Sequence, residues 1–565
     1  MPSDDGLLTR REAADRAGVT LGTIRLWERA GRLHPIQTGD HRIGPLYSSI
    51  ELAKAMRRTA LLQAASGVEA AMHDVDAGAP VEAPEDRGAP EAAEDLSPQE
   101  VAPIVELPGP RKRGGRAGRP PAVLIRERLL KGSAWVLLGT AAATILGTAA
   151  NGLLFRVLGK DGFGVYSLGL SIATVGGTLS QLGMERAVVR LVASSLGTGM
   201  PGRARKTLRI VYASALIGSL FLAILLVLGL GKLLADHVFH STALGGVVVF
   251  VAGWLLVSAF QSLFAESFRA FQSFWLATLF NGLVFDVVAV AVFATLHVRH
   301  QHVSVANAIL LTIGAITVSL VASAILLWRR YSGLRGPGDI HLREVFDVAW
   351  PMLGFNMATF LVGTGVDLWV VGALSSRGDV AIYAAASKLV FYVATPFIIA
   401  SQVVPPIIAE LWAQGKKSQL ERSLREVATL AGVPALLVLL LFVFAGRQVM
   451  GFVYGPSARE GAQVLAILAS ARLVAVVTGN SGVALQMTGF QRTMFSLTVV
   501  TGVCSLAAEI VFGRLFGILG VAASTAGAQA MQNLLQLLFA KRRLGIWTHA
   551  ELSVRPFVAL LKRTP

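Results

Sequence analysis

Residues 133–156 read SAWVLLGTAAATILGTAANGLLFR, an apolar run with a single charged residue, which stands at its end. As a helix, this run is long enough to cross a hydrocarbon core of roughly 30 Å. Similar runs recur as far as residue 540, whereas residues 1–130 are mostly polar and charged. Because a segment in lipid must satisfy its own backbone hydrogen bonds, we expect each run to be a helix.

The predicted fold is therefore all-α, a polytopic membrane protein of about twelve transmembrane helices. The expected helices cover residues 133–156, 165–189, 207–231, 243–267, 274–297, 303–327, 348–372, 379–407, 425–445, 461–487, 492–513 and 518–540.

The amino-acid composition of the chain is not that of a typical soluble protein. Of the 565 residues 53% are hydrophobic and only 15% are charged, and the mean hydropathy is +0.60. Soluble domains carry about a quarter charged residues. Cys504 is the single cysteine, so a disulfide, a zinc site with several thiolates and a Cys-based redox pair are excluded.

The composition changes along the chain and divides it into four zones. Residues 1–60 form a small module, and residues 61–125 form a linker with a polybasic end that we expect to be disordered. Residues 126–545 form the membrane domain, and residues 546–565 form a cytoplasmic tail. Met1 begins a polar segment, so the first apolar helix is expected to act as an uncleaved insertion signal.

Basic residues give the orientation. They gather before the first helix and after the even-numbered helices, whereas the other loops carry isolated Lys160, Arg299 and Arg377. The positive-inside rule then places both termini in the cytoplasm, in an inner-membrane protein. The clustered residues are Arg111, Lys112, Arg113, Arg116, Arg119, Arg203, Arg205, Lys206, Arg329, Arg330, Arg335, Lys416, Lys417, Arg422, Lys541, Arg542 and Arg543.

The membrane domain contains an internal echo. VLGKDGFGVYSLGL at 157–170 leads into the second expected helix, and ALSSRGDVAIYAAAS at 373–387 leads into the eighth. Each combines a Gly-containing turn with a tyrosine, which predicts two six-helix halves with a central site between them.

The same stretches resemble the Wzx-like oligosaccharide and polysaccharide flippases of the multidrug/oligosaccharidyl-lipid/polysaccharide superfamily. The similar segments are residues 158–171, QLGMERAVVRLVA at 181–193, VDLWVVGAL at 366–374, IYAAASKLV at 382–390 and GILGVAASTA at 517–526.

That resemblance implies an alternating-access fold of twelve to fourteen helices that moves an undecaprenyl-diphosphate-linked saccharide across the cytoplasmic membrane. It also implies membrane lipids and the polysaccharide polymerase machinery as partners. Two alternatives stay open: a cation-coupled multidrug-type exporter of the same superfamily, and a membrane-tethered transcriptional regulator. The sequence carries no HExxH, P-loop or GxSxG motif, so we expect a transporter with no catalytic residue, metal or cofactor.

Charges inside the apolar runs mark the candidate site. An ionised side chain at mid-bilayer costs about 2.5–3.5 kcal/mol, so it should face a cavity or a partner unless it snorkels to the interface. The predicted substrate-binding cations, suited to a diphosphate, are Arg186, Arg190, Lys388 and Arg472.

The predicted coupling or pairing acids are Asp286 and Asp367. Asp367 and Lys388 lie at similar depth in the membrane, which allows them to pair.

The N-terminal module has a helix-turn-helix pattern. LTRREAADRAGVTLGTIRLWERAGRL at 8–33 resembles the MerR/excisionase type of winged helix-turn-helix, and residues 39–56 resemble its wing and following helix. The second helix is suited to a major groove, with Thr20 capping it and Thr23 and Arg25 facing outward. The resemblance implies DNA contacts by Arg25, Arg29 and Arg42. A fold retained for protein contacts is the alternative. The basic run at 111–120 favours contact with anionic lipid.

Overall fold

The computed structural model describes residues 7–9, 13, 46–48, 121–362, 365–401 and 404–551. The chain divides into two units, Met1–Gly114 and Gly115–Pro565. In the first unit, strand β1 (Leu7–Thr9) pairs antiparallel with β2 (Leu46–Ser48). The predicted DNA contacts Thr20, Thr23, Arg25, Arg29 and Arg42, and most of the predicted linker, lie outside the described residues.

In the second unit, every described element of regular secondary structure is a helix. Up to residue 332 its helices are α4 (Pro121–Ser180), α5 (Met184–Gly197), α6 (Pro201–Leu225), η1 (Leu226–Leu230), α7 (Gly231–Leu233), η2 (Leu234–Val238), α8 (Thr242–Gly245), α9 (Val248–Ala270), α10 (Phe274–Thr278), η3 (Leu279–Leu283), α11 (Val284–Val298) and α12 (Val305–Ser332).

The second half begins after a connection at residues 333–341. Its helices are α13 (Leu342–Val362), α14 (Val366–Leu374), α15 (Arg377–Ser401), α16 (Val404–Ala413), α17 (Lys417–Tyr454), η4 (Pro456–Gly461), α18 (Ala462–Thr478), α19 (Ser481–Met487) and α20 (Gln491–Leu544). Among the described residues, nine helices are long and apolar enough to cross a membrane.

Two of those nine helices double back on themselves. Inside α4, Gly159 has φ 72° and ψ 177°, and Asn151 and Thr174 line the same cavity although a straight helix would separate them by about 35 Å. Inside α20, Gly517 has φ 59° and ψ −143°, and the Gln532 amide donates to the Thr498 hydroxyl at 3.1 Å. Each is therefore a helical hairpin, with its turn at a glycine that tolerates positive φ.

Three segments that were each predicted to be one helix are interrupted in the structure. The run 165–189 breaks at Gly183, whose φ is 79° and whose missing Cβ allows close contact with the Ala349 carbonyl. The run 461–487 breaks at Gly479, with φ 75°. The run 348–372 is divided between α13 and α14 and is not among the nine spanning helices. Some glycines in membrane helices break the helix, and others only allow a neighbouring helix to approach closely. Both kinds occur within apolar runs, so the sequence does not distinguish them.

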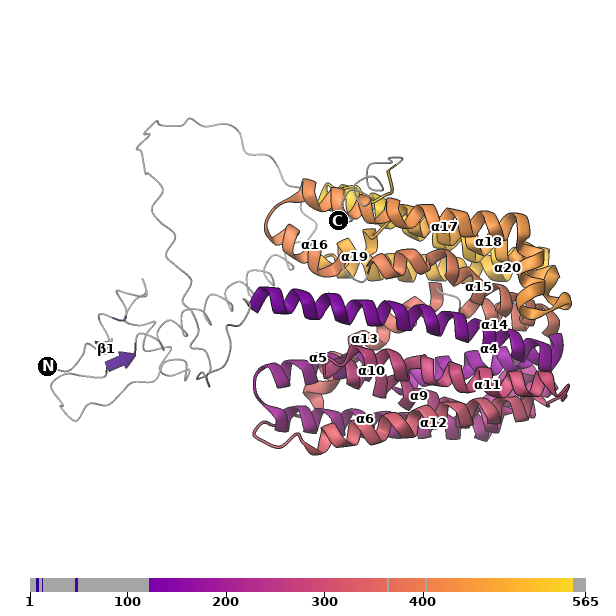
Figure 1. Ribbon diagram of the computed structural model, residues 1–565, viewed down its shortest axis with the longest axis horizontal. Helices are drawn as coiled ribbons and strands as arrows, with labels where there is room; N and C mark the ends of the chain where they lie inside the picture. The colour runs from indigo at the N-terminus through magenta and orange to yellow at the C-terminus, as the bar shows by residue number, and fades with distance from the viewer. Residues whose placement is uncertain are drawn as a thin grey trace, which may run out of the picture. The chain divides into compact units, whose positions relative to one another are not determined.

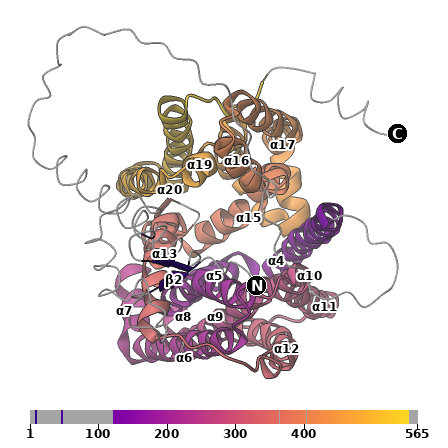
Figure 2. The same ribbon diagram turned by 90° about the vertical axis from the view of Figure 1, so that its left-hand side faces the viewer.

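The helices form two groups (Figure 1, Figure 2). Helices α6, α9, α11 and α12 lie on one side of α4, and α15, α17, α18 and α20 lie on the other. Equivalent polar contacts occur in both groups. The Tyr166 hydroxyl lies 3.0 Å from that of Thr312, and the Tyr383 hydroxyl lies 3.4 Å from that of Thr525. These tyrosines are the ones in the two echoed segments, so the echo corresponds to a repeated structural contact.

At the end of the bundle that contains the α4 turn, here called the turn end, the two groups touch. The Lys160 ammonium pairs with the Glu460 carboxylate at 2.7 Å, and the Arg156 guanidinium donates to the Phe452 carbonyl. Gly164 lies directly against the Arg377 carbonyl oxygen, so close that a Cβ there would collide with it. This end of the bundle is closed.

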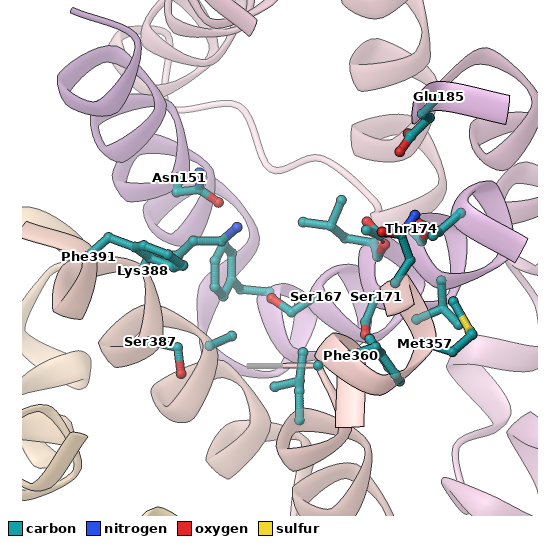
Figure 3. Close-up of a pocket in the computed structure, with 18 residues that line it drawn as sticks. Asn151, Ser167, Ser171, Thr174, Glu185, Met357, Phe360, Ser387, Lys388 and Phe391 are labelled. Carbon is teal, nitrogen blue, oxygen red and sulfur yellow. Dashed lines mark hydrogen bonds between the residues drawn. The ribbon is translucent and has the colours of Figure 1, made fainter. Parts of the chain in front are cut away.

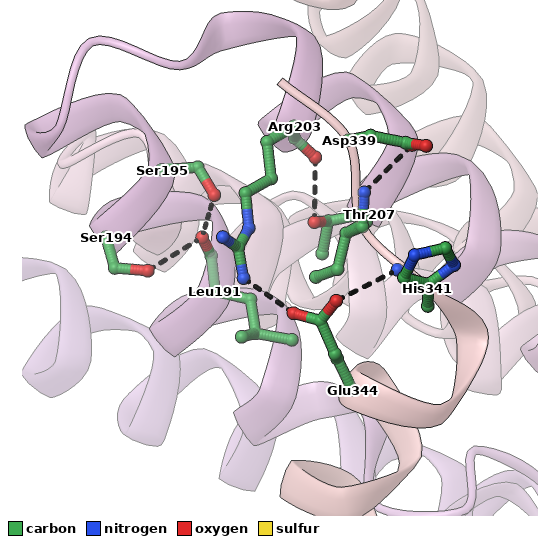
Figure 4. A network of polar contacts seen from close by, with 9 residues as sticks. Leu191, Ser194, Ser195, Arg203, Thr207, Asp339, His341 and Glu344 are labelled. Carbon is green, nitrogen blue, oxygen red and sulfur yellow. Dashed lines mark hydrogen bonds and ion pairs between the residues drawn. The ribbon is translucent and has the colours of Figure 1, made fainter. Parts of the chain in front are cut away.

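At the opposite end, polar contacts join α6 to the start of α13 (Figure 4). Arg203 pairs with Glu344 at 2.8 Å, and the other oxygen of Glu344 accepts the His341 backbone N–H at 3.3 Å. Lys206 pairs with Asp339 in the same connection. The 333–341 connection is therefore fixed to α6.

The segment Gly545–Glu551 packs against the end of α18. The Thr548 hydroxyl donates to the Thr478 carbonyl at 2.7 Å, and Glu551 pairs with Arg425 of α17 at 2.9 Å. The described start of the predicted tail is thus held on the bundle by specific contacts.

Candidate functional site

Two adjoining cavities lie between the helix groups. One, of about 500 Å³, is bounded mainly by the second arm of α4 (after Gly159), α13, α14 and α15, with Asn151 of the first arm and Glu185 of α5 at its edge, and we call it the α13 compartment. The other, of about 480 Å³, is bounded by both arms of α4 together with α9, α11 and α15, and we call it the α11 compartment. Asn151, Leu170, Lys388 and Phe391 line both. Together the compartments form one central cavity between the two halves.

The two arms of α4 supply hydroxyl groups to this cavity. Residues three or four apart share one helix face, and each arm has a run of Ser, Thr or Asn at that spacing. The lining residues of these runs are Thr140, Thr144, Thr148 and Asn151 in the first arm and Ser167, Ser171, Thr174 and Thr178 in the second. Hydroxyl and amide groups are suited to a ligand with many hydrogen-bonding groups, such as a saccharide.

Lys388 is the one cation among the described residues that line either compartment. On α15 its neighbours Ala384, Ala385, Leu389 and Val390 are buried, whereas Lys388 is exposed to the cavity. The ammonium group therefore stands at the junction of the two compartments, in a place that a phosphate oxygen can reach.

Asp286 is the acid that faces Lys388. It lies in the first turn of α11, is 9% exposed, lines the α11 compartment and interacts electrostatically with Lys388. The preceding η3 segment is a π-helical turn, and such turns change the direction of side chains and recur at functional sites. Asp286 and Lys388 come from opposite halves, so their attraction acts across the cavity.

A buried acidic network lies in the second half. Asp367, 1% exposed, accepts a hydrogen bond from the Tyr383 hydroxyl at 2.8 Å. Tyr383 is next to Thr525, which donates to Glu509 at 3.0 Å, and Ser505 donates to the same Glu509 oxygen at 2.7 Å. The second Glu509 oxygen is buried and has no hydrogen-bond partner among the described residues.

The sequence profile of a family described as "Polysaccharide biosynthesis protein" matches residues 129–412, just over half of the chain. The chain belongs to this family. The match covers both arms of α4, α9, α11, α13, α14 and α15, and so includes every helix that bounds the central cavity.

Solved transporter structures share the fold of this family member. An inward-facing multidrug resistance MATE family transporter of the MOP superfamily is 15% identical with a TM-score of 0.58, and covers 75% of this chain and 96% of its own. Lipid II flippase MurJ, in an inward closed conformation, is 15% identical with a TM-score of 0.56, covering 75% and 89%.

A point mutant of the Vibrio cholerae MATE transporter VcmN is 14% identical with a TM-score of 0.51, covering 75% and 98%. No curated protein matches the sequence. At these identities the likeness establishes the fold. The family member therefore shares the fold of these MATE and MurJ structures, and its long apolar helices make it a multi-pass membrane protein.

The structure brings only some of the predicted site residues together. Lys388 and Asp286 share the cavity, but Arg472 of α18 reaches it only through Phe391, whose ring centroid lies 5.4 Å from the guanidinium. Arg186 and Arg190 are exposed on α5 and line neither compartment.

The partner of Asp367 also differs from the expected one. Asp367 is hydrogen-bonded to Tyr383 and lies in the second-half network, while Lys388 interacts with Asp286. Asp367 is buried against Tyr383, whereas Lys388 lines the central cavity, so the expected pairing of the two is replaced by these separate contacts.

Two functional candidates were missed by the sequence analysis. Glu509 is an acid inside the apolar run 492–513, and the criterion that selected Asp286 applies to it equally. Glu185 lies in the segment QLGMERAVVRLVA and lines the α13 compartment, with its carboxylate accepting from the Ser262 hydroxyl at 3.0 Å. Figure 3 shows Glu185 and Lys388 far apart across this compartment.

Proposed function

We propose that this family member is a flippase that moves an undecaprenyl-diphosphate-linked oligosaccharide across the cytoplasmic membrane for surface polysaccharide biosynthesis. The observation that carries the proposal is Lys388, a lone described cation at the junction of two hydroxyl-lined compartments. Its ammonium would hold the diphosphate as a point charge, the hydroxyl groups would bind the saccharide, and the polyprenyl tail would stay in lipid.

The proposed cycle is alternating access. The turn end is closed by contacts between the halves, so the saccharide would enter from the opposite end and leave when the turn end opens. With the hairpins of α4 and α20 each counted as two crossings, and α13–α14 as one, the proposed count is twelve. Basic residues near the α5 end favour placing that end, and both termini, at the cytoplasm.

The test of this function is the sidedness of the lipid-linked intermediate. Cells that lack the chain are expected to accumulate undecaprenyl-diphosphate-linked oligosaccharide in the cytoplasmic leaflet, and the full chain is expected to clear it. Protection of the glycan from an impermeant oxidant in inverted and right-side-out vesicles measures the distribution. Absence of any accumulation would favour the multidrug-type exporter, which a drug-resistance assay of the same strains detects.

We further propose that Asp367 and Glu509 couple transport to a cation gradient. The two carboxylates interact electrostatically. Tyr383 donates to Asp367, Thr525 donates to Glu509, and the two donor hydroxyl oxygens lie 3.4 Å apart. The unpartnered Glu509 oxygen supports uptake of a proton or another small cation there, because a buried charge without a partner is costly.

For Asp367→Asn and Glu509→Gln we expect transport to fall about tenfold or more and to stop responding to an imposed cation gradient. The measurement is glycan flipping in proteoliposomes with and without the gradient. Glu410→Gln is the control, since Glu410 is an exposed acid on α16 outside the network. Variants that keep the full gradient response would exclude this coupling role.

We also propose that residues 1–60 form a MerR-like DNA-binding module whose contacts include Thr20, Thr23, Arg25, Arg29 and Arg42. Support comes from the sequence resemblance and from the β1–β2 pairing, which is compatible with a small closed module. The polysaccharide polymerase machinery remains the proposed protein partner. A chain starting at residue 115 separates the two roles, because a membrane-tethered regulator would lose its function while a flippase would keep transport.

A further inference from the structure

The charges in the α13 compartment are unequally distributed. Of the described residues that line it, only Lys388 and Glu185 are charged, and they lie far apart (Figure 3). If Lys388 holds the diphosphate, as the proposed function requires, Glu185 is the charge that the described lining of this compartment leaves for the saccharide, and it is negative.

Glu185 is held in place by a chain of hydrogen bonds. The Gln181 amide donates to the Ser262 hydroxyl at 2.8 Å, and Ser262 donates to Glu185 Oε1 at 3.0 Å. Gln181 is 2% exposed, and its amide also donates to the Ala259 carbonyl at 3.2 Å, so Ser262 is supported by a buried and doubly bonded side chain. Ser262 uses only one oxygen of Glu185, and the carboxylate retains acceptor capacity for a ligand.

The α4 wall of the same compartment also presents acceptors. The Thr174 hydroxyl donates to the Leu170 carbonyl at 2.8 Å, and the Thr178 hydroxyl donates to the Thr174 carbonyl at 3.0 Å. With their protons engaged, both hydroxyls offer lone pairs to the cavity. Carboxylate and hydroxyl acceptors together suit a ligand rich in O–H or N–H donors.

We infer that Glu185 is a specificity-determining residue that admits neutral or amino-substituted saccharides and rejects saccharides with a carboxylate. A neutral sugar satisfies the acceptors with its hydroxyl protons. A uronic acid in the same place would bring a second negative charge into a confined space and would supply no donor from its carboxylate. This inference rests on the proposed function, because it uses Lys388 as the diphosphate site.

The test uses the full chain in proteoliposomes with two polyprenyl-diphosphate disaccharides, identical except that one ends in a hexose and the other in the matching hexuronic acid. The initial flipping rate is measured by protection from an impermeant oxidant. We expect the wild type to prefer the neutral lipid by about tenfold. In Glu185→Gln, which keeps the acceptor for Ser262 but removes the charge, we expect that preference to fall below about threefold.

Two further variants keep the result decisive. Glu185→Asp retains the charge and is expected to retain the preference. Glu426→Gln removes an exposed acid on α17 outside the cavity and is expected to change neither rate. Equal wild-type rates for the two lipids, or an unchanged preference in Glu185→Gln, would overturn the inference while leaving the flippase function in place. If the wild type moves neither lipid, the proposed function fails and this inference fails with it.

Discussion

Replacing Lys388 by glutamate is expected to lower glycan flipping at least about 100-fold while leaving membrane insertion intact. The reversal puts an acid next to Asp286 and removes the one described cation of the central cavity. Turning this electrostatic attraction into repulsion, together with losing the cation proposed to hold the diphosphate, accounts for the loss. A barrier higher by about 2.7 kcal/mol already corresponds to 100-fold.

The measurement is flipping of a polyprenyl-diphosphate disaccharide in proteoliposomes, at matched amounts of inserted protein. Lys388→Arg preserves the charge and is expected to keep at least about a tenth of the activity, since Arg also binds phosphate but with a planar geometry. Lys416→Glu makes the same reversal at an exposed residue between α16 and α17, outside the cavity, and serves as the control. Wild-type flipping by Lys388→Glu would remove Lys388 from the substrate site.

Hydropathy located most of the helices because it depends only on position along the chain. Several features can be recognised in the sequence itself: the apolar runs, the glycine at the first hairpin turn and the tyrosines of the two echoed segments. The helix breaks at Gly183 and Gly479 cannot be recognised there, since their cause is close contact with Ala349 and Thr548, which are distant in the sequence.

The presence of charges inside apolar helices was readable from the sequence, but the direction in which each side chain faces was not. Lys388 and Arg472 are both charges deep inside apolar helices, yet only Lys388 lines the cavity. A soluble helix reveals its inner face by apolar periodicity, whereas here lipid, core and neighbouring helices are all apolar. Which face of α18 meets Phe391 is decided by tertiary contacts, so the sequence alone could not exclude Arg472 from the lining.

Glu185 was missed in the sequence because its position in the predicted helix did not mark it as a cavity residue. In the predicted helix 165–189 it falls near the C-terminal end, next to Arg186, where a charged residue is ordinary and gives no indication of a cavity. Only the break at Gly183, the Ser262 hydrogen bond and the neighbouring α4 hydroxyls give it a place in the α13 compartment. An acid near the end of a predicted membrane helix is therefore worth testing as a substrate contact.

Replacing Gly164 by valine is expected to abolish transport by preventing closure of the turn end. In the closed state Gly164 contacts the Arg377 carbonyl so closely that no Cβ can be accommodated, and main-chain atoms of both halves would have to separate. The Lys160–Glu460 pair lies at the same contact between α4 and the second half. A cost of about 3 kcal/mol in the closed state alone shifts its population more than about 100-fold, and every proposed cycle passes through that state.

Cross-linking measures this closure directly. Lys160→Cys and Glu460→Cys, in a Cys504→Ser background, are expected to cross-link efficiently in the parent chain and poorly after Gly164→Val. Gly314→Val is the matched control, because Gly314 is exposed on α12 with no atom near its missing Cβ, and it should leave both cross-linking and flipping unchanged. If Gly164→Val cross-links and flips like the parent, closure of the turn end does not depend on this contact. Loss of flipping together with loss of cross-linking would instead tie transport to the approach of α4 and α15 at Gly164, the place where the two echoed segments meet.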